Sequence, residues 1–234
     1  MKVTLIIPTL NELGGMKVIM PRIKKEWYDQ LIVIDGGSTD GTIEYAKENG
    51  YFVYVQKAKG LRQGLREIWH MVIGDVVVTF SPDGNCIPEL IPDLIKKMED
   101  GYDMVILSRY AKGAKSLDDD IVTKFGNWMF TTMINVLFGA RYTDALGIYR
   151  AYKKDLINKL HIDREAQFLK LAERRGILIG WEPQLSIRCA KRRLRVTEIP
   201  GDEPARIYGE RKMRPFASGS IMLAQIVYEI FVWR

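Results

Sequence analysis

The chain has 234 residues, 47% of them hydrophobic, which excludes the disordered and fibrous classes and suffices for one large domain or one domain with an appendage. Its 35 Lys and Arg outnumber its 29 Asp and Glu, and the net charge of +6 suits an anionic partner such as a nucleotide, a phospholipid surface or nucleic acid. The two cysteines, Cys86 and Cys189, have neither CxxC spacing nor histidine partners, so we expect a reducing compartment and no zinc site or disulfide framework.

Strands and helices alternate through the first half of the chain. Short apolar runs end in Pro, Gly, Asp or Asn, and helical stretches follow them. In chain order the expected elements are a strand at 2–7, a helix reaching about 26, a strand at 31–34, a helix reaching 49–50, a strand at 51–55, a helix at 60–72, a strand at 75–80, a helix at 88–99 and a strand at 103–107. This alternation predicts an α/β fold with a mostly parallel sheet and right-handed crossovers.

The second half is expected to complete the same domain. A long apolar helix at 121–139 follows a charged loop, and helices at 163–176 and 181–193 precede a strand at 194–199. No internal repeat or low-complexity linker interrupts this part, so we place the domain at 1–213 and a C-terminal helix at 214–234. The N-terminal segment MKVTLIIPTLNE has too short an apolar stretch for a signal peptide, and we therefore expect no secretion.

The C-terminal segment 216–233 is almost wholly apolar. It is shorter than the ~20 apolar residues that a membrane-spanning helix needs, and it carries a charge. Ser218, Gln225 and Glu229 fall on one stripe at helical spacing, so we expect a helix with a narrow polar edge and a wide apolar face. Three alternatives stay open: packing on the core, in-plane anchoring in a membrane beside the basic stretch 206–214, and contact with a second copy of the chain.

The stretch VVVTFSPDGNCIPE, residues 76–89, is the strongest candidate for a ligand site. Its apolar run predicts a buried strand that stops before Asp83 and Asn85, at the strand end where open α/β sheets bind ligands. These two side chains supply hard oxygen ligands, and Gly84 between them lets a bulky ligand approach the backbone. We therefore expect a divalent cation that holds a phosphorylated substrate, with an ordinary turn as the alternative.

Other strand ends carry polar residues that we expect at the same edge of the sheet. Glu12 and Asp35 follow the first and second strands, and their placement with Asp83 favours a nucleotide site in which Asp35 accepts hydrogen bonds from a base or ribose. Taken singly, each carboxylate is explained as well by capping or turn formation. Asp144, before a small-residue turn, is another carboxylate that can point into a site. The chain has no GxGxxG and no GxxxxGK(S/T) motif, so dinucleotide and P-loop phosphate binding have no support.

Six stretches carry a family resemblance. They are IIPTLNE, VIDGGSTDGT, SPDGNCIPELIPDLI, YDMVILSRYAKGA, TDALGIYRAYKKD and EIPGDEPARIYGERKM, and they cover residues 3 to about 213 in the family's order. Together they resemble the family-2 glycosyltransferases of GT-A fold, and within them the dolichol-phosphate mannose synthase and polyprenyl-phosphate glycosyltransferase branch. The resemblance implies a metal-dependent, inverting glycosyltransferase that uses a nucleotide-diphosphate sugar.

The resemblance also assigns roles to individual residues. It implies that the base and ribose are bound by Pro8, Thr9, Glu12 and Asp35. It implies that Asp83 and Asn85 bind Mg²⁺ or Mn²⁺ together with the diphosphate. Arg109 matches the arginine that helps hold an acceptor phosphate, and Arg206 with Lys212 matches the arginine and lysine that clasp the donor diphosphate.

Four features depart from the family pattern. Ser81 stands where the family has the first Asp of the metal motif, so we expect weaker metal affinity that depends more on the phosphates of the nucleotide. Gly36 replaces a common Asp, which leaves the base open, and Arg211 replaces the serine of the diphosphate loop. The acidic run 118–120 occupies the region of a second acceptor-phosphate arginine, which weakens the lipid-phosphate assignment.

The leading interpretation is an enzyme at the cytoplasmic face of the membrane, peripheral to it, that transfers a sugar to a polyprenyl phosphate. The metal and Arg206 would neutralise charge on the leaving diphosphate, and Arg109 with Lys124 would position the anionic acceptor. One alternative is a hydroxyl acceptor, on a glycan or small molecule, with Asp144 as general base. Another, prompted by Ser81, is a nucleotide-sugar-binding module without catalysis. No aromatic-interleaved basic patch supports nucleic-acid binding, and a homo-oligomer formed through residues 221–233 stays open.

Overall fold

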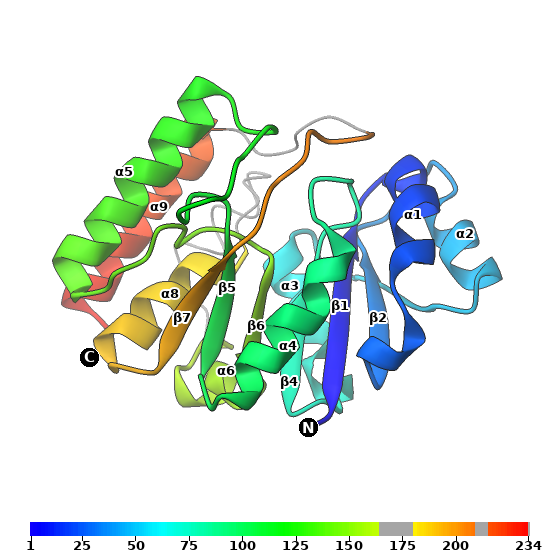
Figure 1. Cartoon of the computed structure of the whole chain (residues 1–234), viewed down its shortest axis with the longest axis horizontal. Helices are drawn as coiled ribbons and strands as arrows, with labels where there is room; N and C mark the ends of the chain where they lie inside the picture. Colours follow the sequence, from blue (N-terminus) through cyan, green and yellow to red (C-terminus); the bar gives the residue numbers. More distant parts are fainter. Residues whose placement is uncertain (164–179, 209–214, 234) are drawn as a thin grey trace.

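The computed structural model describes residues 1–163, 180–208 and 215–233, and its centre is a seven-stranded sheet (Figure 1). The strands are β1 (Val3–Thr9), β2 (Gln30–Asp35), β3 (Phe52–Val55), β4 (Val76–Thr79), β5 (Met104–Ser108), β6 (Arg150–Lys153) and β7 (Val196–Pro200). Their order across the sheet is β3-β2-β1-β4-β6-β5-β7, and only β6 runs antiparallel to its neighbours within this described sheet. The predicted α/β class and mostly parallel sheet are confirmed.

Helices cover both faces of the sheet. Their bounds are α1 (Leu13–Ile19), α2 (Thr42–Glu48), α3 (Leu61–Ile68), α4 (Ile91–Glu99), α5 (Ile121–Phe138), α6 (Leu156–Lys159), α8 (Glu182–Lys191) and α9 (Pro215–Phe231), with 3₁₀ turns at Met20–Arg22, Lys25–Trp27, Trp69–Met71 and Pro88–Leu90. On one face α1, α2 and α4 bury Met16, Ala46 and Leu94. On the other face α3, α6 and α8 form a second cluster that includes Leu65 and Leu185.

The central strands are mostly apolar because both of their faces are covered. In β1, Leu5 and Ile7 belong to the cluster on one face of the sheet, whereas Ile6 belongs to the cluster on the other. All three side chains are fully buried. A strand of this kind carries a continuous apolar run with no polar alternation, which is why its sequence predicts a buried parallel strand.

The first helix ends earlier than its sequence predicts. A helix reaching about residue 26 was expected, but α1 ends at Ile19 and two separate 3₁₀ turns follow it. Pro21 falls in the first of these turns, and proline lacks the backbone N–H that continues an α-helix. The helix expected at 163–176 falls almost entirely within 164–179, outside the described residues.

The C-terminal helix α9 belongs to the packed domain. Glu229 and Arg188 of α8 are both buried and form an ion pair at 2.8 Å. Just beyond the helix, the ring of Trp233 lies 4.5 Å from the Arg188 guanidinium, and the Lys191 ammonium donates to the carbonyl oxygens of Glu229 and Trp233. Gln225 is also fully buried, so the polar edge predicted for this helix faces the protein interior.

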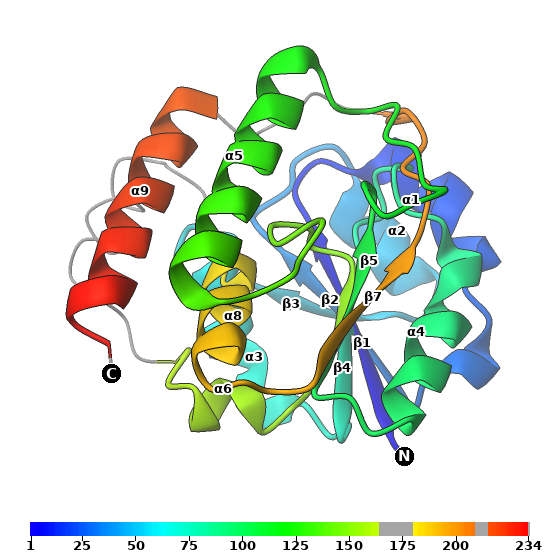
Figure 2. The ribbon, with the colours of Figure 1, turned by 60° about the vertical axis from the view of Figure 1, so that its left-hand side comes forward.

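An outer layer of two helices flanks the domain. Figures 1 and 2 show α5 and α9 side by side, with α8 between them and the sheet. Phe130 of α5, Ile187 of α8 and Ile226 of α9 share one buried cluster. None of the helices in the described ranges is long and apolar enough to cross a membrane.

Candidate active site

The ends of β1 and β2 are joined by hydrogen bonds at the carboxyl edge of the sheet. Thr9 lies opposite Asp35, and its hydroxyl donates to the Asp35 carboxylate at 2.8 Å; Pro8 precedes it in β1. Asp35 is fully buried and also accepts from the backbone N–H groups of Gly37 and Ser38, at 2.8 and 2.7 Å, and from the Ser38 hydroxyl at 2.6 Å. Both carboxylate oxygens hold the loop in shape, and the contact of Asp35 with a base or ribose stays a prediction.

A second set of contacts fixes Glu12 beside this loop. The backbone N–H of Glu12 donates to the Thr42 hydroxyl at 3.0 Å, and Asp40 accepts from the Thr42 N–H at 3.0 Å. Asn11 has a left-handed backbone conformation, with φ of 53°, and its N–H donates to the Ser38 hydroxyl at 2.8 Å. The sequence predicts that these loops converge, and the hydrogen bonds show how they are held together.

Asp83 is paired with an arginine at the end of β4. Its carboxylate lies 2.8 Å from Arg206, and it is only 4% exposed. Burial raises the pKa of Asp83, although the neighbouring Arg206 opposes that effect. Arg206 also lies 3.6 Å from Asp118. The structure therefore brings together the predicted metal ligand and the predicted diphosphate arginine, whereas Lys212 lies outside the described residues.

The segment that carries Arg206 lies directly over the loop after β4. The Ile207 N–H donates to the Asp83 carbonyl oxygen at 3.1 Å. Gly84 has a φ of +94°, which favours glycine, and a Cβ at this position would collide with the Ile207 side chain. Gly84 is therefore required both by its own backbone conformation and by the approach of this segment.

Asn85 makes two side-chain contacts through its amide. Its Nδ2 donates to Glu203 at 3.5 Å, and its Oδ1 accepts a weak hydrogen bond from Cys86 at 3.4 Å. Within the described ranges no group of three or more His, Cys, Asp or Glu side chains is arranged to hold a metal ion. The side chains that could bind a metal here are one carboxylate, that of Asp83, and one amide, that of Asn85. That set fits Mg²⁺ or Mn²⁺ whose other ligands are phosphate oxygens and water.

Arg109 is surrounded by three carboxylates after β5. Its Nε and Nη2 donate to Asp144 at 2.6 and 3.1 Å, and its Nη1 lies 3.3 Å from Asp119 and 3.2 Å from Glu203. Asp144 is fully buried; burial alone would raise its pKa, but Arg109 holds the pKa below its usual value. Asp144 is thus an ionised group that fixes the orientation of the Arg109 guanidinium.

Glu203 connects Arg109 with Asn85 of the loop after β4, and the sequence did not single it out. It accepts from Arg109 and from Asn85, and the Ser116 hydroxyl also donates to it. Burial raises the pKa of Glu203, while Arg109 opposes that effect. The one sequence feature that could have pointed to Glu203 is its position in the stretch EIPGDEPAR, three residues before Arg206. Its contacts with a loop some 90 positions earlier could not be read from spacing.

An apolar groove begins beside Arg109 and follows α5. It has a volume of about 640 Å³ and is lined by Tyr110, Ile121, Lys124, Phe125, Asn127, Trp128, Thr131, Thr132, Asn135, Tyr142 and Thr143. The Tyr110 ring lies 5.2 Å from the Arg109 guanidinium, and Thr143 directly precedes Asp144. The groove therefore extends from the surroundings of Arg109 along the outer helix α5.

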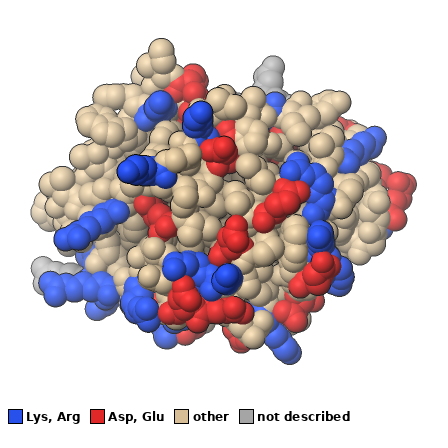
Figure 3. Space-filling model, viewed as in Figure 1, with Lys and Arg blue, Asp and Glu red and all other residues tan. Residues whose placement is uncertain are grey.

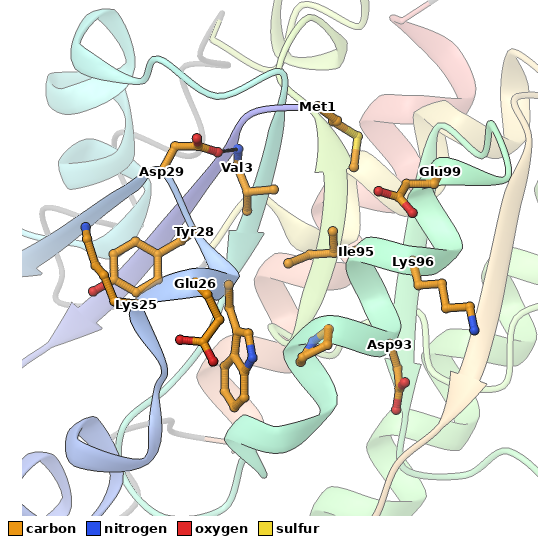
Figure 4. A pocket seen from close by; sticks show the side chains of 12 residues that line it. Met1, Val3, Lys25, Glu26, Tyr28, Asp29, Asp93, Ile95, Lys96 and Glu99 are labelled. Carbon is orange, nitrogen blue, oxygen red and sulfur yellow. Dashed lines mark hydrogen bonds between the residues drawn. The ribbon is translucent and has the colours of Figure 1, made fainter.

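A second hollow, of about 540 Å³, lies at the opposite edge of the sheet (Figure 4). Its lining includes Met1, Lys25, Tyr28, Lys96 and Glu99, which come from the start of β1, the turn before β2 and α4. None of the residues predicted for the site lines this hollow. It is therefore separate from the carboxyl ends of the strands, where the predicted residues meet.

Comparison with known proteins identifies the family. The profile of Glycosyl transferase family 2 matches residues 4–160. The chain belongs to this family. Its family-2 relatives include glycosyltransferase AglJ of Haloferax volcanii, 26% identical over 229 residues and covering 96% of this chain and 70% of the relative. Undecaprenyl-phosphate mannosyltransferase of Micrococcus luteus is 27% identical over 242 residues, which cover 97% of this chain and 92% of the relative.

One further relative and one solved structure are also similar to this chain. Dolichyl-phosphate hexose transferase of Haloferax volcanii is 28% identical over 225 residues, covering 95% of this family-2 chain and 91% of the relative. The crystal structure of glucosyl-3-phosphoglycerate synthase from Mycobacterium tuberculosis with uridine diphosphate superposes with a TM-score of 0.70 at 20% identity, covering 98% of this chain and 80% of that one. The same synthase has been crystallised with Mn²⁺ and UDP-glucose. The predicted GT-A fold and the predicted glycosyltransferase class are confirmed.

Proposed function

We propose that this glycosyltransferase moves a sugar from a nucleotide-diphosphate sugar to a polyprenyl phosphate, with inversion at the anomeric carbon. The observation that carries the proposal is the apolar groove beside Arg109. A polyprenyl phosphate is a long apolar chain with one anionic end, and the groove provides aromatic walls, among them Phe125 and Trp128, that lead to a guanidinium. The relatives named for undecaprenyl- and dolichyl-phosphate substrates support the same acceptor class.

The donor is proposed to occupy the edge formed by the loops after β1, β2 and β4. Pro8, Thr9, Glu12 and Asp35 would hold the base and ribose. Asp83 and Asn85 would hold a Mg²⁺ or Mn²⁺ ion, which when bound neutralises charge on the diphosphate. Arg206 lies against Asp83 and needs only to exchange this carboxylate for a phosphate oxygen to stabilise the leaving group. Lys212 is proposed to assist it.

The acceptor phosphate is proposed to bind Arg109. Asp144 holds two nitrogens of this guanidinium, which leaves Nη1, now paired with Asp119 and Glu203, to exchange a carboxylate for a phosphate. A phosphate oxygen is already anionic, so it can attack the sugar without a strong general base. In this mechanism Asp144 and Glu203 orient other groups and do not remove a proton. Because the acceptor is a membrane lipid, we place the enzyme peripherally at the cytoplasmic face of the membrane.

A second candidate is transfer to a hydroxyl acceptor. It is favoured by the three carboxylates around Arg109, which lower the attraction of this region for another anion. Asp144 would then be the general base. Against this role, Asp144 is fully buried and Arg109 holds its pKa below the usual value, which makes it a weak base.

A donor screen tests the proposal directly. Release of UDP, GDP or dTDP from several nucleotide sugars is measured with and without polyprenyl phosphate, and in parallel with soluble hydroxyl acceptors. We expect one donor whose turnover rises on addition of polyprenyl phosphate and whose sugar is recovered on the lipid. Transfer to a soluble hydroxyl acceptor, with no response to the lipid, would instead establish the second candidate.

A further inference from the structure

The outer helices α5 and α9 expose apolar side chains at helical spacing. On α5 the exposed stripe is Ile121, Phe125, Trp128 and Val136, and on α9 it is Phe216, Leu223, Val227, Ile230 and Phe231. Trp128 is 62% exposed and Phe231 is 72% exposed, so these rings are not covered by the domain. Single exposed apolar residues are common in soluble proteins, but two aligned stripes of them are not.

Several polar side chains of the same helices face inward, although Lys124, Thr132 and Ser220 are exposed. On α5, Thr123, Asn127 and Thr131 are buried, and on α9 Gln225 and Glu229 are buried. A surface helix of a soluble protein has the reverse arrangement, with its apolar stripe toward the core and its polar residues toward water. Both helices are therefore built for surroundings less polar than water on their outer side.

The two stripes lie on the same flank of the molecule. Gly219 of α9 lies close to the Phe130 ring of α5, and Figure 2 shows the two helices side by side and outside α8. On the face drawn in Figure 3, the surface over α5 is largely uncharged. Together the stripes make one apolar surface, which we call the α5–α9 face.

We propose that the α5–α9 face is a docking surface for a lipid bilayer with anionic headgroups. Lys124 is the only charged residue of α5, and it is exposed; Glu229 is the only charged residue of α9, and it is buried in its ion pair with Arg188. The face thus presents apolar side chains and a positive charge without an acidic residue from either helix, which is the complement of an anionic lipid surface. In a contact between two copies each Lys124 ammonium would lose water without an acidic residue of α5 or α9 to pair with, so a second copy is the poorer fit.

Membrane docking through the α5–α9 face would explain how a lipid acceptor reaches the groove, and this part of the inference rests on the proposed function. The groove beside Arg109 is lined by Phe125 and Trp128, which also belong to the α5–α9 face. A lipid acceptor could therefore enter the groove from the bilayer without exposing its chain to water. The docking itself requires no transfer reaction and can be measured without a donor.

Vesicle co-sedimentation of the full chain tests the proposal. Vesicles of phosphatidylcholine alone are compared with vesicles that also contain phosphatidylglycerol, for the wild type and for Val136→Asp and Val227→Asp. These two positions are exposed, lie on different helices and do not line the groove. Each charge should lower partitioning by about tenfold or more, because the transfer free energy of a buried valine is lost. Ile73→Asp, at an exposed apolar position before β4, is the matched control and should partition like the wild type.

The outcomes separate docking from transfer. We expect the wild type to bind anionic vesicles more tightly than neutral ones, and both variants to keep their circular dichroism and their transfer to a short, water-soluble isoprenyl phosphate. Wild-type protein that stays in the supernatant, or variants that partition as it does, would overturn the proposal. A dimer by sedimentation velocity that both substitutions dissociate would assign the face to a second copy. If one variant fails to fold, the vesicle binding of the variant on the other helix still tests the proposal.

Discussion

Asp83 and Arg206 form an ion pair at the proposed donor site. The carboxylate is almost fully buried, and in the absence of a ligand its partner is the guanidinium 2.8 Å away. A buried carboxylate needs such a partner, because the unpaired charge would be costly in surroundings of low polarity. Ser81 supplies no charge beside it, so Asp83 is the one carboxylate that the predicted metal motif contributes.

Replacing Asp83 by Asn should abolish metal-dependent transfer. The expected loss in kcat is at least about hundredfold, the usual scale for removing a group that stabilises developing charge. Mn²⁺ binding in the presence of the nucleoside diphosphate is measured by calorimetry alongside sugar transfer. Asp93→Asn, an exposed carboxylate on α4, is the control and should leave both quantities unchanged. Wild-type Mn²⁺ affinity in Asp83→Asn would exclude Asp83 as a ligand.

The variant Asp144→Asn distinguishes a positioning residue from a general base. If Asp144 orients Arg109, the variant should raise the KM for the acceptor by about tenfold or more, as expected when a charge-assisted contact of ~1.5–3 kcal/mol is lost. The pH profile of kcat should keep its shape. If Asp144 is the base for a hydroxyl acceptor, transfer should instead be abolished. Near-normal transfer rates would count against Asp144 as the general base for a hydroxyl acceptor. An unchanged KM for the acceptor would count against its role in orienting Arg109.

At the scale of single elements, α9 is attached to the domain through buried charge as well as through apolar packing. Its Glu229 carboxylate accepts from Arg188 and from Gln184 of α8, and all three side chains are buried. A pair of this kind contributes little when intact, but removing one partner leaves the other charge unpaired in the interior. The attachment of α9 is therefore sensitive to a change that preserves shape and removes charge.

Glu229→Gln should lower the free energy of unfolding by about 3–5 kcal/mol, because Arg188 stays buried without its counter-ion. Chemical denaturation followed by circular dichroism measures the difference. Asp100→Asn is the control, since Asp100 pairs with Lys97 at the protein surface, where solvent screens the interaction. An equal and small effect of both substitutions would show that α9 does not depend on the buried pair.

The elements were predicted well where the pattern was local. The strands at β1, β2 and β4 follow from apolar runs that end in turn residues, and the helix α5 from a long apolar stretch with Gly139 after it. The end of α1 was missed because its periodicity continues past Pro21. For α9 the sequence predicted a polar edge but not the side that this edge faces. The amphipathic pattern of a helix does not tell whether its polar edge faces water or the protein interior. Only the partner Arg188, some 40 positions earlier, decides it.

At the scale of the whole molecule, the site is assembled from segments that lie far apart in the sequence. Parallel strands bring their C-terminal ends to one edge, so the sequence could predict that the loops carrying Glu12, Asp35 and Asp83 lie at the same edge of the sheet. The contacts that complete the site come from the segment 203–208, which returns to this edge after β7. Glu203 could not be predicted, because nothing in the sequence states which loop that segment crosses.

Ligands of this edge should stabilise the molecule as a whole. A nucleoside diphosphate and Mn²⁺ added together should raise the Tm in thermal denaturation, and should do so by more than the sum of their separate shifts. The reason is that, in the proposed binding mode, each ligand requires the Arg206–Asp83 ion pair to separate. Asp83→Asn is the control and should lose the excess shift. Strictly additive shifts in the wild type would show that the two ligands bind independently.

If the metal binds Asp83 and the donor diphosphate binds Arg206 as proposed, the ion pair between these residues couples metal binding and donor binding thermodynamically. The first of the two to bind must break the pair, and the second finds it already broken, so the free energy of breaking it is spent only once. By linkage, the metal must strengthen donor binding by the same factor as the donor strengthens metal binding. A cell in which free metal is scarce would then load the enzyme with the metal–donor complex in one event, and the arginine would keep the empty site closed to stray cations.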